Sequence, residues 1–263
     1  MEEWISNNST AFRLSIFIGL FILFAVWEIV YPNHKPALER KYRWASNILL
    51  VVLNNALLRI LFPITAIAFA ETAVQNRWGF LNSLNLPAPA SFILGILFLD
   101  FVIYLQHSVF HSLPLLWRLH RMHHADLELD VTSGTRFHPI EIIISMFIKI
   151  AAIAVSGVSP FTVLIFEVIL NGMAMFNHSN IYIPEKADQI LRILFVTPAM
   201  HRIHHSVIPS EYNMNYGFNL SVWDRIFGTM KNNAQGTLVL GLNIFREKKD
   251  SRLDQLLIQP FRG

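Results

Sequence analysis

HSVFHSLPLLWRLHRMHH (residues 107–124) is the stretch that decides how this chain folds, and HRIHH (residues 201–205) repeats its ending. Ten of the eleven histidines lie between residues 107 and 205, where an even spread would put about four. Spacings of three and four residues bring side chains to one face of a helix. The histidines form three boxes, at residues 107–111, 120–124 and 201–205. Each box directs two or three imidazoles towards one point, which indicates a metal site.

The number of imidazoles narrows the kind of metal site. A structural zinc ion closes its shell with four ligands that usually include cysteine, and this chain has no cysteine. Eight to ten imidazoles fit two metal ions of higher coordination number. Iron, copper, zinc and nickel all accept imidazole, so the ligands alone leave the element open.

Composition indicates a membrane protein in one domain, spanning residues 1–263. The chain is 53% hydrophobic and 15% charged, with a mean hydropathy of +0.42, which is too apolar for an ordinary soluble domain. The net charge of +3 comes without a dense basic run, which argues against nucleic acid as a partner.

Apolar runs predict the spans. Residues 12–30, 44–70 and 91–111 are long enough to cross a bilayer, and residues 140–176 form a helical hairpin with its turn near residue 158. The expected fold is therefore an all-α integral membrane protein with about four transmembrane helices, including the hairpin, and a histidine-rich helical cap. Because Lys35, Arg40, Lys41 and Arg43 precede the second span, the positive-inside rule places this loop and the cap on the cytoplasmic side.

The third span carries a single polar stripe. Asp100, Tyr104, His107 and His111 stand at helical spacing on an otherwise apolar segment. Such a stripe must face protein and not lipid. A hydrogen-bonded ladder that joins helices would explain Asp100 and Tyr104, but the two histidines that continue the stripe favour a role for Asp100 in supporting metal ligands.

Two pairs of residues are equidistant from the turn of the hairpin. Lys149 and Glu167 fall at one depth, where each charge makes the other less costly in lipid, so we expect them to pair. His138 and His178 fall together at the mouth of the hairpin.

The arginines of the two HRxHH boxes, Arg121 and Arg202, point away from the histidine face. We expect them to be solvated, to face headgroups or to dock an acidic electron donor.

The whole pattern resembles the fatty acid hydroxylase and sterol desaturase superfamily, over residues 95–230. The resemblance rests on the three histidine boxes, Asp100, Tyr104, the Phe137-His138-Pro139 turn, Asn177-His178 and the WDRIFG run of residues 223–228. Members are integral-membrane, non-haem di-iron oxygenases. The resemblance implies two iron ions, which zinc can replace in purified protein, and O2 as a co-substrate.

The resemblance also implies roles for particular residues. It assigns catalytic support to Asp100, Tyr104, Asn177 and Asp224, and we expect Asp224 to accept the spare ring N–H of a ligating histidine, with an ordinary salt bridge as the alternative. Depth matching and the resemblance together add His138 and His178 to the ligands. The expected metal ligands are His107, His111, His120, His123, His124, His138, His178, His201, His204 and His205.

The implied reaction is O2-dependent hydroxylation of a C–H bond in a fatty acyl, sterol-like or other lipid. Desaturation and ether-lipid cleavage start from the same chemistry and stay open. Alkylglycerol monooxygenases carry a glutamate after their first box, where this chain has Ser112, so pterin-dependent ether cleavage is not predicted. The alternative from another class is a non-catalytic metal-binding membrane protein, although a transporter would spread ionisable groups along a path. A zinc hydrolase is a further alternative, but its site needs only three protein ligands and a general base, so ten histidines are too many for it.

The implied partners are a membrane lipid and a separate electron donor. No haem or flavin module and no Gly-rich dinucleotide fingerprint is visible in the sequence, so electrons would come from a cytochrome b5, a ferredoxin or a reductase. We expect a bacterial inner membrane, or the endoplasmic reticulum in a eukaryote, with the metals on the cytoplasmic side. The particular lipid and the oligomeric state are left open.

Overall fold

The computed structural model describes residues 8–36 and 39–262, and these residues are helical apart from loops and three isolated β-bridges. Five helical segments of the described chain are long and apolar enough to cross a membrane, where the sequence predicts about four spans. They are Ser9–Val30, Arg43–Ser83, Ala88–Ser112, Pro139–Ser156 and Pro160–His178.

The long helices are α2 (Ser9–Val30), α3 (Arg40–Leu61), α4 (Ala66–Gln75), α6 (Ala88–Ser112), α7 (Pro114–His124), α8 (Pro139–Ser156) and α9 (Pro160–His178). The short ones are α5 (Phe80–Ser83), η1 (Ser133–Thr135), α10 (Glu185–Leu191), α11 (Pro198–His204), α12 (Pro209–Tyr212), α13 (Val222–Ile226), η2 (Lys248–Ser251), α14 (Leu253–Ile258) and η3 (Gln259–Phe261). The second predicted run is thus two helices, since the chain breaks around Pro63 between α3 and α4.

Proline begins the helices that position the histidines. Helices α7, α8, α9 and α11 each carry proline in the first turn, where its missing N–H costs nothing and its fixed φ suits the helix. Thr197 caps α11 by accepting a hydrogen bond from the amide of Met200. The registers of the two HRxHH boxes are therefore fixed a few residues before each box.

The hairpin of α8 and α9 turns where the sequence predicts. Gly157 adopts a left-handed φ of 69°, and a Cβ there would lie 2.1 Å from the carbonyl oxygen of Trp78. Glycine is thus required for both the turn and the close approach. The predicted pair across the hairpin is confirmed, with Lys149 Nζ 2.8 Å from Glu167 Oε1, and Arg13 of α2 also pairs with Glu167.

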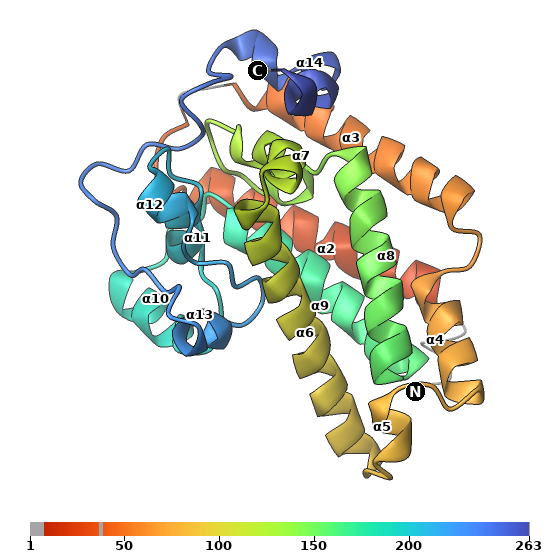
Figure 1. Ribbon diagram of the computed structural model, residues 1–263. Coiled ribbons are helices and arrows are strands. Elements are labelled where there is room, and N and C mark those ends of the chain that lie inside the picture. Colours follow the sequence, from red (N-terminus) through yellow and green to blue (C-terminus); the bar gives the residue numbers. More distant parts are fainter. Residues whose placement is uncertain (1–7, 37–38, 263) are drawn as a thin grey trace.

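Helix α9 lies at the centre of the bundle and packs against α2, α4 and α6, while α8 packs against α3, α4 and α6 (Figure 1). Helices α7, α11 and α12 gather where α6 and α9 end, near His111 and His178. We call this the histidine end of the spans. It brings the boxes, the first and last of which are about ninety residues apart in sequence, into one layer.

The two arginines of the HRxHH boxes are buried, so the expectation of solvated or headgroup-facing charges is wrong. Arg121 donates through Nη2 to the carbonyl of Gln259 at 2.8 Å, and Arg202 donates through Nη2 to the carbonyl of Ser179 at 3.0 Å. Each guanidinium satisfies carbonyls of a neighbouring segment. The arginines therefore fasten the two box helices to the rest of the fold.

Candidate metal centre

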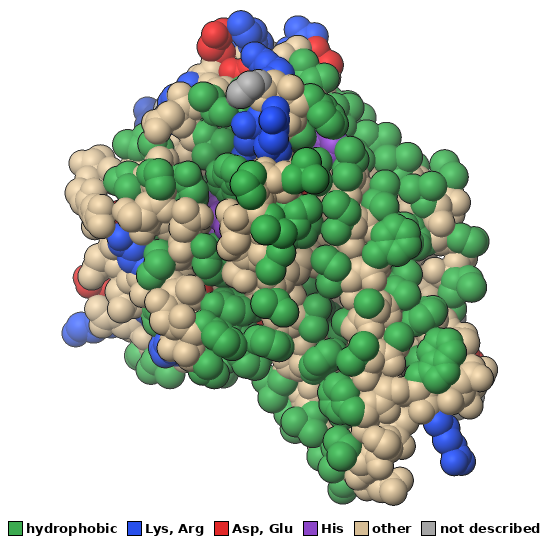
Figure 2. Space-filling model, in the orientation of Figure 1, with side chains coloured by type: hydrophobic (Ala, Val, Ile, Leu, Met, Phe, Trp, Pro, Cys, Tyr) green, Lys and Arg blue, Asp and Glu red, His purple; other side chains and the backbone are tan. Residues whose placement is uncertain are grey.

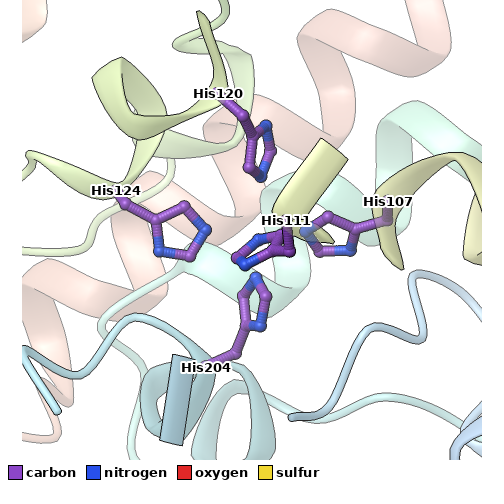
Figure 3. Close-up of side chains that lie close together, drawn as sticks. All are labelled: His107, His111, His120, His124 and His204. Atoms are coloured by element: carbon purple, nitrogen blue, oxygen red, sulfur yellow. The ribbon is translucent and has the colours of Figure 1, made fainter. Parts of the chain in front are cut away.

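Nine of the ten predicted ligands meet in two adjacent groups, in each of which the ligand atoms lie within 4.8 Å of one another. The five-histidine cluster draws on α6, α7 and α11, and Figure 3 shows its rings pointing towards a common centre. It consists of His107, His111, His120, His124 and His204. The four-histidine cluster draws on α7, α9 and α11 and consists of His123, His178, His201 and His205.

The two HRxHH boxes supply the clusters in opposite ways. In α7, the first and last histidines, His120 and His124, face the five-histidine cluster, and the middle one faces the other. In the box of α11, the first and last histidines, His201 and His205, face the four-histidine cluster, and His204 faces the five-histidine cluster. Positions i and i+4 share one helix face and i+3 projects beside it. The two helices therefore bridge both clusters, and the rings of His124 and His205 stack at 4.4 Å where the clusters meet.

In the five-histidine cluster, three of the five rings have their outer nitrogen held by an acceptor. His120 Nδ1 lies 2.7 Å from Glu141 Oε1, and His204 Nδ1 donates to the carbonyl of Met214 at 2.8 Å. His107 Nδ1 donates to the carbonyl of Tyr216 at 2.8 Å. These bonds place the proton on Nδ1 and leave the lone pair on Nε2.

Unpartnered ring nitrogens in the five-histidine cluster show whether its residues fit a metal ion. The Nε2 atoms of His120 and His204 are buried and have no hydrogen-bond partner among the described residues. A buried polar atom without a partner is costly, unless something such as a metal ion supplies the missing interaction. Lone pairs from imidazole are the donors that iron, zinc and copper accept. The residues therefore fit a metal ion.

In the four-histidine cluster, the Nε2 atoms converge even more closely. His178 Nε2 lies 3.0 Å from that of His123 and 2.9 Å from that of His201. Two of the four outer nitrogens find backbone acceptors. His178 Nδ1 donates to the carbonyl of Ala174 at 2.7 Å, and His123 Nδ1 donates to that of Arg136 at 3.2 Å. Four lone pairs aimed at one point, in a set of nitrogen donors alone, fit a second metal ion.

Burial keeps these imidazoles neutral, the form that binds a metal. Burial lowers the pKa of His204 to about 3, and burial together with neighbouring imidazoles lowers the pKa of His123 and His201 well below the ordinary value. The pKa of His124 and His205 falls well below that value for the same two reasons. At neutral pH these five rings offer lone pairs without first losing a proton.

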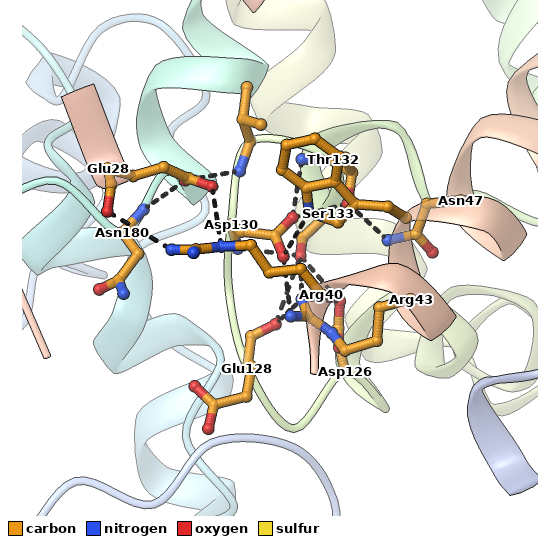
Figure 4. A network of polar contacts seen from close by, with 12 residues as sticks. Glu28, Arg40, Arg43, Asn47, Asp126, Glu128, Asp130, Thr132, Ser133 and Asn180 are labelled. Atoms are coloured by element: carbon orange, nitrogen blue, oxygen red, sulfur yellow. Dashed lines mark hydrogen bonds and ion pairs between the residues drawn. The ribbon is translucent and has the colours of Figure 1, made fainter. Parts of the chain in front are cut away.

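A buried polar network supports the loop that follows α7 (Figure 4). Arg43 of α3 binds Asp126 through Nε at 2.7 Å and Asp130 through Nη1 at 2.7 Å. Glu28 of α2 accepts the amides of Val131 and Asn180. Burial opposes ionisation of Asp126, yet the neighbouring arginines lower its pKa to about 2. The network thus anchors the chain two residues after His124.

His138 lies outside both clusters. Its Nδ1 accepts a hydrogen bond from the amide of Ile140 at 3.2 Å, and its Nε2 lies 3.2 Å from the carbonyl of Leu257. Burial lowers the pKa of His138, so it serves as a neutral cap for α8. Its sequence neighbour Glu141 is instead the residue that reaches a cluster. Sequence reasoning missed Glu141, although a carboxylate in the first turn of an apolar helix was the available signal.

Asp100, Tyr104 and Asn177 fasten the segment of residues 213–229 to the spans. Asp100 Oδ2 accepts the indole N–H of Trp223 at 2.8 Å, and the Tyr104 hydroxyl lies 2.9 Å from Thr229 Oγ1. Asn177 donates to the carbonyl of Phe218 at 2.6 Å. The hydrogen-bonded ladder considered for Asp100 and Tyr104 therefore describes their contacts. We call residues 213–229 the closing segment.

Among the described residues, Asp224 hydrogen-bonds to the closing segment itself and not to a histidine ring, so its expected direct contact is replaced by an indirect one. Its Oδ1 and Oδ2 accept the amides of Tyr216 and Gly217, both at 2.8 Å, and Oδ1 accepts the Thr229 hydroxyl at 2.7 Å. The carbonyl of Tyr216 in turn accepts the ring N–H of His107. Asp224 thus orients a histidine through one intervening peptide.

Comparison with known proteins agrees with this centre. The model of the fatty acid hydroxylase family matches residues 92–229, which is more than half of the chain and includes both clusters. The chain belongs to the fatty acid hydroxylase family. No solved structure matches the chain.

The curated relatives act on lipids. The ornithine lipid hydroxylase OlsE of Rhizobium tropici is 26% identical over 82% of this chain and 66% of its own length. The alkylglycerol monooxygenase of Caenorhabditis elegans is 26% identical over 62% of this chain and 31% of its own length. Human cholesterol 25-hydroxylase is 23% identical over 84% of this chain and 82% of its own length. The chain thus spans just under two thirds of the first of these relatives and about a third of the second.

Proposed function

We propose that this protein is a membrane-bound lipid hydroxylase that uses O2 and two iron ions held by the two histidine clusters. The observation that carries the proposal is the convergence of nine buried imidazoles, in two touching groups, at one end of apolar spans. The family and the lipid-modifying relatives support the same reaction class. The catalytic region would be residues 95–230.

The protein would contribute geometry and a dry site. When bound, two iron ions would supply the redox chemistry that activates O2 for attack on a C–H bond. Glu141 and the carbonyls of Tyr216 and Ala174 orient the ligand rings before any metal arrives. The closing segment, fastened by Asp100 and Tyr104, covers the clusters and keeps water away from them.

A narrow cleft between α6, α8 and α9 is the candidate entry point for the lipid chain, and at about 10 Å³ it has room for about one water molecule. It runs past Gln106, the neighbour of His107, and past Ser145, one turn from Glu141, to the Lys149 side chain. The rest of its lining is apolar, and the Gln106 amide donates to Ser145 Oγ at 2.7 Å across it. The helices would have to part along this cleft for a lipid chain to place one carbon near the metals.

The proposal also covers the electron donor and the side of the membrane on which the metal centre lies. Electrons would come from a separate cytochrome b5, ferredoxin or reductase. Arg40 and Arg43 lie at the histidine end, where they contact Glu28 and Asp126. Basic residues beside spans favour the cytoplasmic side, which supports a cytoplasmic metal centre in a bacterial inner membrane, or in the endoplasmic reticulum of a eukaryote.

Metal analysis of protein from iron-supplemented cells tests the proposal, together with His123→Ala in the four-histidine cluster and His204→Ala in the five-histidine cluster. We expect about two iron ions per chain in the wild type and about one in each variant, because each change removes one ligand of one site. The matched control is His34→Ala, since His34 lies outside both clusters and pairs with Glu128.

Product analysis completes the test. Lipids extracted from expressing cells should contain species that have gained one oxygen atom, and these should disappear in both cluster variants and persist with His34→Ala. A single zinc ion, or no metal, in protein that still makes these products would overturn the proposal. Metal binding without any oxygenated lipid would favour the non-catalytic metal-binding protein.

A further inference from the structure

A patch of large apolar side chains is exposed outside the five candidate spans. Ile190, Ile193 and Ile226 have exposed fractions of 68%, 65% and 62%. The patch, which we call the lateral patch, consists of Ile190, Ile193, Leu194, Phe195, Ile226 and Phe227. Contiguous exposed apolar surface of this kind marks an interaction with another apolar surface.

The position of the lateral patch indicates what that surface is. Helix α13 lies beside α6 and not beyond its end (Figure 1), since the rings of Trp223 and Phe227 pack on Phe101 at 5.0 and 5.8 Å. Phe101 precedes the end of α6 at Ser112 by about 16 Å of helix rise. The patch is therefore level with the body of a span.

The lateral patch is also continuous with the outer surface of that span. Leu105 and Val109 of α6 are exposed one and two turns after Phe101. In Figure 2, hydrophobic side chains cover the face on which α13 lies against α6. The same lipid that covers Leu105 would therefore reach Ile226 and Phe227 without crossing a polar boundary.

The backbone of the lateral patch is satisfied from within the protein. Arg225 donates to the carbonyls of Arg192 and Ile193, and the Ser221 hydroxyl donates to the carbonyl of Arg192 at 2.7 Å. The amide of Ser221 donates to the carbonyl of Leu194 at 3.0 Å. A surface loop in water has no need of such partners, whereas irregular backbone in a bilayer does.

We propose that residues 190–195 and 222–227 lie inside the bilayer, in the leaflet at the histidine end, with the lateral patch against lipid. The start of α10, with exposed Glu185 and Lys186, and the exposed polar residues near Gln235 remain in water. The closing segment is thus held at the membrane by a patch distinct from the five spans. Lipid is the partner, and the proposal does not depend on the reaction that the metal centre performs.

Spin labelling in vesicles tests the proposal, and the absence of cysteine from the chain means that single cysteines can be labelled without background. Ile193→Cys and Ile226→Cys report on the lateral patch, Leu105→Cys on a lipid-facing span and Gln235→Cys on water. The labelled full-length proteins are placed in phosphatidylcholine and phosphatidylglycerol vesicles. Collision of each label with oxygen and with water-soluble chromium oxalate is then measured by power saturation.

We expect the labels at residues 193 and 226 to match the label at residue 105, with a high ratio of oxygen to chromium oxalate collision. Labels that match residue 235 would overturn the proposal. Where the Ile193→Cys protein does not fold, Phe195→Cys reports on the same patch, because Phe195 is also exposed. The readout contains no turnover, so its outcome is separate from the success or failure of the hydroxylase proposal.

Discussion

The five-histidine and four-histidine clusters share helices α7 and α11, yet they are held by different parts of the molecule. Ring nitrogens of the four-histidine cluster hydrogen-bond to the carbonyl of Ala174, inside α9, and to that of Arg136, which follows the Arg43–Asp126 network in the chain. Ring nitrogens of the five-histidine cluster hydrogen-bond to the carboxylate of Glu141 and to the carbonyl of Tyr216 in the closing segment. One cluster is thus built into the interior of the fold, and the other stands beside the cleft.

This difference teaches that changes outside the ligands can act on one cluster at a time. The network around Asp126 is buried and charged, so its loss destabilises the fold. The four-histidine cluster is affected only as a result of that destabilisation. Glu141 touches a ligand of the other cluster directly. Asp224 acts on that cluster only through a peptide. These three positions provide tests in order of decreasing effect.

The largest effect is expected for Arg43→Ala. Removal of the guanidinium leaves the buried carboxylate of Asp130 without this ion pair, and leaves that of Asp126 with Arg136 alone, at 3.3 Å. This loss costs about 3–5 kcal/mol in the free energy of unfolding. Denaturant titration in micelles measures this loss. Lys41→Ala is the control, because Lys41 is exposed on the same helix, and it should change stability by no more than about 0.5 kcal/mol. Equal effects of the two changes would refute a supporting role for the network.

A smaller and more local effect is expected for Glu141→Gln. The carboxylate fixes His120 through its Nδ1 atom, and loss of such a partner typically weakens metal binding by about 10–100-fold. Competition with a chelator should show this weakening at one of two metal equivalents, while the second equivalent stays unchanged. Glu185→Gln, at an exposed position, should leave both unchanged. Weakening of both equivalents by Glu141→Gln would contradict the separation of the clusters.

The smallest effect is expected for Asp224→Asn, and it should depend on pH. Burial raises the pKa of Asp224 to about 6, so the fold favours its protonated form. The stabilisation from this proton is complete below the ordinary pKa near 4 and is lost as the pH rises through about 6. The asparagine variant lacks this titration.

Thermal unfolding in micelles between pH 4 and pH 8 checks this prediction. The difference in stability between the wild type and Asp224→Asn should shift in favour of the variant as the pH rises, with little further change above pH 7. Asp254→Asn, at an exposed carboxyl group, is the matched control and should show no such shift in favour of the variant. A difference that stays constant with pH would show that Asp224 is not held in its protonated form.

The sequence by itself determined the spans, the hairpin turn and the grouping of the histidines into helical boxes. These features follow from local rules, namely apolar length, proline and glycine positions, and the spacing of three or four residues along a helix. The Lys149–Glu167 pair was predictable for the same reason, since two helices joined by a short turn place equidistant residues at one depth. The family resemblance then indicated the chemistry.

Only the tertiary structure decided which histidine joins which cluster, that His138 joins neither, and that Glu141 supports His120. Helical spacing defines a shared face, but the angle between helices decides what that face meets. The partners of the outer ring nitrogens are mostly backbone carbonyls, which have no signature in the sequence. Asp224 shows the same limit, because its effect on His107 passes through the carbonyl of Tyr216, whose position only the folded chain determines.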